Sequence, residues 1–422
     1  MNKALIPLLY QLFTSNFPFS PFNFTFTFYV LILHFTFPMQ LPIYMDFNAT
    51  TPVDQRVLNV MLPFFTTHYG NAASTNHEYG WQAAEAVELA REQVAKLIQA
   101  EPGEIIFTSG ATEAVNLAIK GVYESYASKG NHIITCATEH KAVLDTCNYL
   151  EKKGASITYL PVDNKGRISL YEIEKHILPT TILIALMYAN NETGIIHPIK
   201  EIGALAKKNN TLFFTDATQA IGKTPVNVLD DGIDIMAFSA HKIYGPKGTG
   251  ALYVRRKKPR VNIAPQIHGG GHQKEMRSGT LNVPGIVGLG KACDILYNEM
   301  NDEIKRLEQL RNTFEKEILK TANTFLNGDD DKRLPNVTNI CFNGFEKNAL
   351  HAALNKYISF SSGSACTSAK PSPSHVLKAM GASDADANSS IRFSVGRFTT
   401  KEDINFAKEK IVQVSKTLFN NV

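Results

Sequence analysis

From residue 104 onward, short apolar runs alternate with amphipathic stretches of helical periodicity. Strand-like runs occupy residues 104–108, 132–135, 181–188, 211–215, 234–239 and 250–254, and the clearest helical patterns follow them at 113–126, 141–153 and 201–208. Strands that alternate with helices indicate a mostly parallel sheet covered by helices on both faces. We therefore predict an α/β fold. In such a sheet, ligands bind outside the carboxyl ends of the strands.

The pattern changes after about residue 300. A long charged amphipathic helix is predicted at 303–319, followed by segments at 336–342 and 349–355, a Ser/Gly loop, a segment at 390–394 and a last helix at 401–418. This order is typical of a smaller α+β domain, and 422 residues are enough for two domains. We predict a large domain over 53–300 and a small domain built from 39–52 and 301–422.

The first 38 residues differ from the rest of the chain. They contain one lysine, no acidic residue and many phenylalanines. Their core apolar run is shorter than the ~20 residues that a membrane-spanning helix needs. A signal peptide would have a more basic start and small residues at a cleavage site. We interpret residues 1–38 as an extension outside the fold that results from a translation start upstream of Met39. A membrane or targeting segment is the alternative.

The composition narrows the classes of partner. The net charge is +4, and no long basic run with interleaved aromatic residues occurs, so we expect neither nucleic acid nor a membrane as partner. The five cysteines form no C-x-x-C pair, which argues against a structural zinc site and a disulfide framework. Their odd number fits a reducing compartment, so we expect a cytoplasmic protein without a metal.

Two polar groups follow predicted strands in positions that suit a phosphate and a cation. Ser109-Gly110-Ala111-Thr112 lies between a strand and a helix, where backbone N–H groups and a hydroxyl bind phosphate well. An ordinary helix cap is the alternative. Asp216 closes an apolar strand, where a carboxylate is costly unless it meets a cation such as a protonated pyridine. A helix cap is again the alternative.

Two further groups suit covalent and proton-transfer chemistry. Lys242 closes the strand at 234–239, and partial desolvation there would lower its pKa and favour Schiff-base formation; an ordinary surface lysine is the alternative. His140 follows another strand and could stack on a flat cofactor and move protons, or be a loop histidine. A phosphate cradle, an acid, a lysine and a stacking histidine together describe a site for pyridoxal phosphate (PLP).

Cys366 lies in a stretch of small residues, Ser361 to Ala369, that cannot anchor a core. Such composition predicts a loop that presents the thiol, although a buried cysteine is the commoner case. The other cysteines lie in strand or helix patterns and are predicted to be packing residues: Cys136, Cys147, Cys293 and Cys341.

Many ordered motifs resemble those of cysteine desulfurases of the NifS/IscS type, in the class V aminotransferase family of PLP enzymes. The resemblance runs from about Met39 to the last helix. It is carried by ATTPVD (49–54), TSGATEA (108–114), TEHKAVLDTC (138–147), NNETG (190–194), DATQA (216–220), SAHKIYGPKG (239–248), HGGGH (268–272), MRSGTLNV (276–283), SSGSACTSA (361–369) and SSIRFSVGRF (389–398).

The resemblance implies PLP-dependent transferase fold type I and a role for each site residue. Lys242 would hold PLP as an internal aldimine, Asp216 would pair with the pyridine nitrogen, and Gln219 with the ring oxygen. His140 would stack on the ring and serve as acid or base. The phosphate would be held by Ala111, Thr112, Ser239 and His241, with Thr280 reaching the phosphate of the other subunit of a homodimer. Asn191, also placed beside the cofactor, and Arg392 would bind the substrate carboxylate.

The implied reaction removes sulfur from L-cysteine, giving L-alanine and a persulfide on Cys366. The persulfide would pass to an acceptor such as an iron–sulfur scaffold protein, for cluster assembly or for tRNA thiolation. Selenocysteine lyase and another class V aminotransferase-like enzyme are the alternatives. A transaminase has no need of a loop thiol, so Cys366 discriminates against it. A non-catalytic binding protein of sulfur metabolism is disfavoured because Lys242, Asp216, His140 and Cys366 are all present.

Overall fold

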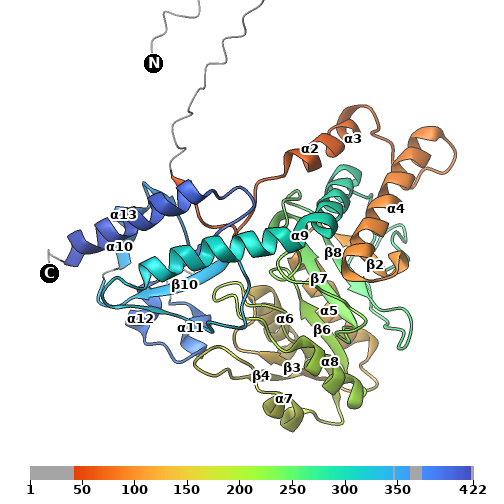
Figure 1. Cartoon of the computed structure of the whole chain (residues 1–422). Helices are drawn as coiled ribbons and strands as arrows, with labels where there is room; N and C mark the ends of the chain where they lie inside the picture. Colours follow the sequence, from red (N-terminus) through yellow and green to blue (C-terminus); the bar gives the residue numbers. More distant parts are fainter. Residues whose placement is uncertain (1–41, 346, 362–372, 420–422) are drawn as a thin grey trace, which may run out of the picture. The chain divides into compact units, whose positions relative to one another are not determined.

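The computed structural model of the chain describes residues 42–345, 347–361 and 373–419. Residues 1–38, predicted to lie outside the fold, and Cys366 with most of its loop fall outside these ranges. Figure 1 shows the described elements coloured along the sequence. None of the helices in these ranges is long and apolar enough to cross a membrane.

A seven-stranded sheet forms the centre of the structure. Its order is β2 (Ile105–Thr108), β8 (Gly250–Val254), β7 (Ile235–Ser239), β6 (Leu212–Asp216), β5 (Thr181–Ala185), β3 (His132–Cys136) and β4 (Ser156–Leu160). Only β8 runs antiparallel to its neighbours, and the remaining neighbouring strands pair in parallel. The predicted, mostly parallel sheet is therefore confirmed. The edge strand β4 was not predicted, because its partly exposed residues form no continuous apolar run.

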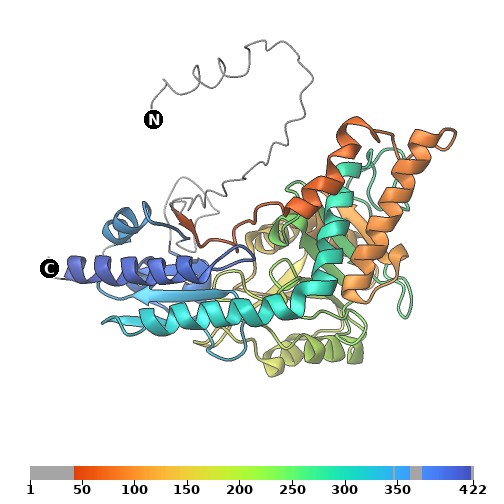
Figure 2. The same cartoon turned by 45° about the horizontal axis from the view of Figure 1, so that its top comes forward.

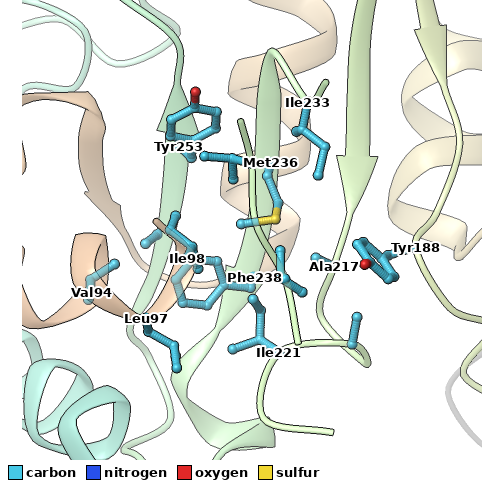
Figure 3. Close-up of a cluster of buried hydrophobic side chains, with 14 of the residues drawn as sticks. Val94, Leu97, Ile98, Tyr188, Ala217, Ile221, Ile233, Met236, Phe238 and Tyr253 are labelled. Atoms are coloured by element: carbon cyan, nitrogen blue, oxygen red, sulfur yellow. The ribbon is translucent and has the colours of Figure 1, made fainter. Parts of the chain in front are cut away.

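Helices cover both faces of this sheet, as predicted. Successive strand residues alternate between two hydrophobic clusters: Ile105 and Phe107 join one, whereas Ile106 joins the other. The first cluster contains residues of α4 (Glu78–Ile98), α8 (Ile199–Lys208) and α9 (Val283–Ile318); the second contains residues of α5 (Ala111–Ser125) and α6 (Lys141–Glu151). Burial on both faces explains why the strands are continuous apolar runs. Figure 3 shows part of the first cluster, where Leu97 and Ile98 of α4 lie beside Phe238.

The predicted helix at 303–319 is wrong at its start, because α9 begins at Val283. Its first half contains Pro284 and several glycines, which lower intrinsic helix propensity and hide the helix from pattern analysis. These glycines permit close packing: a Cβ at Gly290 would lie 2.6 Å from Cα of Ala90 in α4, and one at Gly288 would lie 2.6 Å from the Met61 sulfur. Tertiary contacts therefore stabilise this half.

A second sheet lies beyond residue 320. It is antiparallel, with the order β12 (Ser390–Ser394), β10 (Val337–Phe342) and β9 (Thr324–Leu326). Its core is shared with the end of α9, α10 (Lys347–Leu354) and α13 (Lys401–Phe419). The two-stranded sheet of β1 (Ile43–Tyr44) and β11 (Ile358–Ser359) joins the same cluster. In Figure 2, α13 runs beside α9. The predicted domain boundary at residue 300 falls inside α9, and the division into two domains stays a prediction.

Short helices complete the described chain: α2 (Gln55–Met61), α3 (Pro63–Thr66), α7 (Leu170–His176), α11 (His375–Ala379), α12 (Asp384–Asn388), and the 3₁₀ turns η1 (Pro102–Glu104) and η2 (Ala240–Lys242). The prediction that four cysteines pack in the interior is confirmed. Cys136, Cys147, Cys293 and Cys341 are buried, and burial raises the pKa of each thiol. No group of three or more potential metal ligands occurs in the described ranges.

Candidate active site

A cavity of about 510 Å³ lies where the carboxyl ends of β3, β6 and β7 meet the start of α5. Most of the residues predicted from sequence line it: Ala111, Thr112, His140, Asn191, Asp216, Gln219, Ser239, His241, Lys242 and Arg392. Thr280 does not line this cavity and is exposed. Cys366 lies outside the described residues. The fold thus brings together residues that are separated by up to 281 positions, from Ala111 to Arg392 in the second sheet.

The start of α5 forms the part of the cavity that is suited to bind a phosphate. Gly110 caps the helix with a φ of +154°, a backbone conformation that side chains disfavour. A Cβ at Gly250 would lie 2.7 Å from Cα of Gly110, so two glycine backbones pack directly together here. The N–H groups of Ala111 and Thr112 belong to the first turn, where N–H groups have no acceptor within the helix. They and the Ser239 hydroxyl are suited to an anion.

Lys242 ends η2, directly after β7. Its Nζ donates hydrogen bonds to the carbonyl oxygens of Asn48 (2.7 Å) and Ala49 (2.6 Å). The neighbouring His241 has Nδ1 3.1 Å from Thr50 Oγ1. Burial, followed by the charges of nearby lysines, lowers the pKa of His241 to about 4. The imidazole is therefore neutral at pH 7 and binds through hydrogen bonds rather than through charge.

Asp216 is the last residue of β6 and is buried. Its Oδ1 accepts a hydrogen bond from the Thr218 N–H (2.9 Å), so it caps the following turn while it also lines the cavity. The cap and the cavity position predicted as alternatives therefore coexist. Thr218 also lines the cavity, and its Oγ1 is buried without a hydrogen-bond partner among the described residues.

His140 is the N-cap of α6, and its Nδ1 accepts a hydrogen bond from the Ala142 N–H (3.1 Å). Because Nδ1 is an acceptor, the neutral ring carries its proton on Nε2. The cap also fixes the orientation of a ring that lines the cavity. The imidazole thus has one nitrogen committed to the backbone and one left to exchange a proton.

Arg392, in β12, is buried and also lines the cavity. Its Nη2 pairs with Asp46 Oδ1 (2.8 Å), and its Nη1 donates to the carbonyl oxygen of Asn191 (3.0 Å). Its Nε has no hydrogen-bond partner among the described residues. The backbone N–H and C=O of Arg392 both bond Ser361, the last described residue before Cys366.

Sequence reasoning missed the cavity wall formed by Asn48, Ala49 and Thr50. The ATTPVD motif contains part of it and could have drawn attention to it, but motif position alone assigns no contact. The Asn48 carbonyl accepts hydrogen bonds from both Lys242 and Gln219 Nε2 (3.0 Å). Sequence reasoning also missed Glu113, which lines the cavity and pairs with Arg277 at 2.7 Å.

The residues present fit PLP. The first turn of α5 offers N–H groups for the phosphate, Lys242 offers an amine for the aldehyde, and Asp216 offers a buried carboxylate for the pyridine nitrogen. The unpartnered Thr218 hydroxyl indicates that the cavity accepts a polar ligand. The guanidinium group of Arg392 provides a cation that can bind a substrate carboxylate.

The chain resembles known proteins over most of its length. The class-V aminotransferase family matches residues 43–406. A protein named cysteine desulfurase IscS from Anaeromyxobacter sp. (strain K) is 52% identical over 370 residues, which cover 87% of this chain and 91% of the relative. A protein of the same name from Klebsiella pneumoniae is 52% identical over 375 residues, covering 88% and 92%.

Comparison with solved structures indicates the same family. A NifS-like protein superimposes with a TM-score of 0.83 and 38% identity, covering 90% of this chain and 100% of that structure. The structure of SspA in complex with cysteine gives a TM-score of 0.76 and 38% identity, covering 85% and 100%. These similarities confirm the predicted family and fold type and do not favour selenocysteine lyase. The chain belongs to the class-V aminotransferase family and, within it, to the cysteine desulfurases of the NifS/IscS type.

Proposed function

We propose that the protein is a PLP-dependent cysteine desulfurase that converts L-cysteine to L-alanine and leaves the sulfur as a persulfide on Cys366. The observation that carries the proposal is the placement of Lys242, Asp216 and Arg392 around one cavity. Relatives that are 52% identical bear the name of this enzyme, and the family depends on PLP. Cysteine as substrate is further supported by the similarity to SspA, whose structure was solved in complex with cysteine.

The position of each residue in the cavity suggests the role that we propose for it. Ala111, Thr112, Ser239 and neutral His241 bind the phosphate by hydrogen bonds, and Lys242 holds the cofactor covalently. Asp216 would pair with the pyridine nitrogen, which keeps the ring able to accept electrons. Gln219 would donate a hydrogen bond to the ring oxygen. His140, whose Nδ1 is fixed by the start of α6, would stack on the ring. When bound, PLP supplies an electron sink that labilises bonds at the substrate Cα and Cβ.

The chain's own residues position the substrate and move protons. Asn191 and Arg392 hold the substrate carboxylate, and Asp46 and the Asn191 carbonyl orient the guanidinium for this task. Lys242 Nζ and His140 Nε2 take and return protons. The Cys366 thiolate forms a bond to the substrate sulfur as the Cβ–S bond breaks. The electron pair of that bond stays with the carbon skeleton, and a proton delivered to Cβ completes alanine.

The partners of the reaction are part of the proposal. The enzyme is a homodimer in which Thr280 reaches the phosphate of the other subunit, consistent with its absence from its own cavity. The persulfide passes to an acceptor such as an iron–sulfur scaffold protein, as the name of the relatives suggests, with tRNA thiolation as a further destination. The site of action is the cytoplasm.

A cysteine variant tests the proposal. Cys366→Ser should keep bound PLP and its visible absorbance but lose alanine formation and sulfide release from L-cysteine under reducing conditions. Cys147→Ala is the matched control, because Cys147 is buried in α6 away from the cavity lining, and it should remain active if it folds. Full sulfide release by Cys366→Ser would overturn the role of Cys366. Purified protein that binds no PLP would overturn the proposed function itself.

A further inference from the structure

Lys223 is a buried lysine for which the proposed reaction has no role. It lies in the turns after β6, four residues beyond Gln219, and is 8% exposed. Burial lowers its pKa well below the ordinary value, and the charges of Lys242 and Arg392 act in the same direction, opposed by Glu303. Placing an ammonium group in such surroundings is costly unless hydrogen bonds compensate for the lost hydration.

The Lys223 amine contacts two amide side chains that line the cavity. Its Nζ donates to Gln219 Oε1 (2.6 Å) and lies 3.3 Å from Asn48 Oδ1. Two acceptors match the two N–H bonds that the amine keeps even when it is neutral. The Gln219 amide is thereby held with its oxygen toward Lys223, and the Asn48 oxygen is held by both Lys223 and Asn336 Nδ2 (3.0 Å).

The opposite end of each amide must then be the donor. Gln219 Nε2 donates to the Asn48 carbonyl (3.0 Å), and Asn48 Nδ2 donates to the Asn191 carbonyl (3.2 Å). An amide nitrogen carries two N–H bonds, so Gln219 keeps a second donor after bonding Asn48. Among the contacts of the described residues, Lys223 holds the oxygen end of the Gln219 amide; without Lys223, the bond from Nε2 to the Asn48 carbonyl would be left alone to oppose a turn of the amide.

We propose that Lys223 is a positioning residue that holds the Gln219 amide with its N–H, rather than its C=O, available to the cofactor's ring oxygen. The inference rests on the proposed function, because it concerns how the chain receives PLP. A donor stabilises an anionic ring oxygen, whereas a carbonyl repels it, and hydrogen bonds to charged groups are the stronger ones. The same contact steadies Asn48, whose carbonyl also accepts a hydrogen bond from Lys242 Nζ.

Lys223→Met tests this positioning role, because methionine keeps a long unbranched side chain without a donor. We expect the pH midpoint of the visible absorbance of bound PLP to rise by about one unit, and the affinity for PLP to fall about tenfold, as for one lost hydrogen bond to a charged group. Gln219→Leu should raise the midpoint in the same way. If Lys223 acts through Gln219, the double variant should match Gln219→Leu rather than show the sum of the two shifts.

Controls separate this role from a merely structural one. Lys207→Met, on the exposed side of α8, should leave the midpoint unchanged. If Lys223→Met does not fold, Lys223→Gln, which keeps a donor on a shorter side chain, takes its place in the cycle and should shift the midpoint less than Gln219→Leu. An unchanged midpoint in the Lys223 variant beside a shifted one in Gln219→Leu would overturn the inference, as would additive shifts. An unmodified protein without PLP absorbance would instead refute the proposed function, and the inference with it.

Discussion

Ser374 Oγ donates a 2.5 Å hydrogen bond to Glu192 Oε2, and both residues are buried. Ser374 is the second described residue after the Cys366 loop and caps α11 by accepting the Leu377 N–H (3.2 Å). Glu192 follows Asn191, which lines the cavity. Together with the backbone pairing of Ser361 and Arg392, this contact joins described residues on either side of positions 362–372 to residues at the proposed substrate-carboxylate site.

The titration of Glu192 gives a first prediction. Burial raises its pKa from 4.5 to about 7, against the opposing effects of Ser374 and Arg392. Between pH 4.5 and 7 the folded protein therefore keeps a proton that the unfolded chain has released, so stability falls as pH rises through this window. The contribution is about 3 kcal/mol. Glu192→Gln should remove this loss, which urea unfolding on either side of the window, at about pH 4.5 and about pH 7.5, would measure.

The comparison needs a control for other titrating groups. Glu409→Gln, on the exposed side of α13, should keep the pH dependence of the unmodified protein. Equal pH slopes for Glu192→Gln and the unmodified protein would show that Glu192 is already ionised below neutral pH.

The ion pair between Asp46 and Arg392 leads to a second prediction. Asp46 holds one guanidinium nitrogen at 2.8 Å, so Asp46→Asn should leave Arg392 less firmly oriented. We expect KM for L-cysteine to rise about tenfold with kcat changed less, since a hydrogen bond between charged groups contributes about 1.5–3 kcal/mol. Steady-state kinetics of alanine formation would measure both constants. A fall in KM would mean instead that Asp46 competes with the substrate carboxylate.

The sequence predicted the residues that line the site better than the contacts that orient them. Asp216 and Lys242 each follow an apolar strand, and because parallel strands end at one sheet edge, their meeting in one cavity could be inferred. The strand Gly250–Val254 has its predicted bounds for a related reason: a buried apolar run ends abruptly at turns.

The contacts that orient these residues could not be predicted. Asp46 meets Arg392 across 346 positions, and Lys223 meets Asn48 across 175. No local pattern marks such pairs, because they depend on where the completed fold buries a charge. The first half of α9 was missed for a similar reason, since contacts with α2 and α4 outweigh its glycine content there.

Lys242 provides a third prediction. Lys242→Ala should lose the visible absorbance of covalently held PLP, because the amine that directly follows β7 is then lost. Lys242→Arg is the matched variant: it keeps the positive charge and donors for the Asn48 and Ala49 carbonyls but offers no primary amine, and it should lose the same absorbance. Absorption spectra after PLP addition and gel filtration would decide. Retained absorbance in Lys242→Arg would assign the covalent role to another lysine.

The contact between Gly250 and Gly110 provides the last prediction. An alanine Cβ at position 250 would lie 2.7 Å from Gly110 Cα and from the Phe238 carbonyl oxygen, and backbone atoms cannot move aside cheaply. Gly250→Ala should therefore destabilise the protein by about 1–3 kcal/mol and shift the start of α5. Because the first turn of α5 is the proposed phosphate site, PLP affinity should fall as well.

Gly381→Ala separates these two effects. Gly381 has a φ of +92° and nothing within 4 Å of an added Cβ, so alanine there should cost about 1 kcal/mol of backbone strain without touching the cavity. Its PLP affinity should equal that of the unmodified protein. Thermal unfolding and PLP titration of both variants would measure the two quantities. If Gly250→Ala lowered stability but left PLP affinity unchanged, the start of α5 would not hold the phosphate.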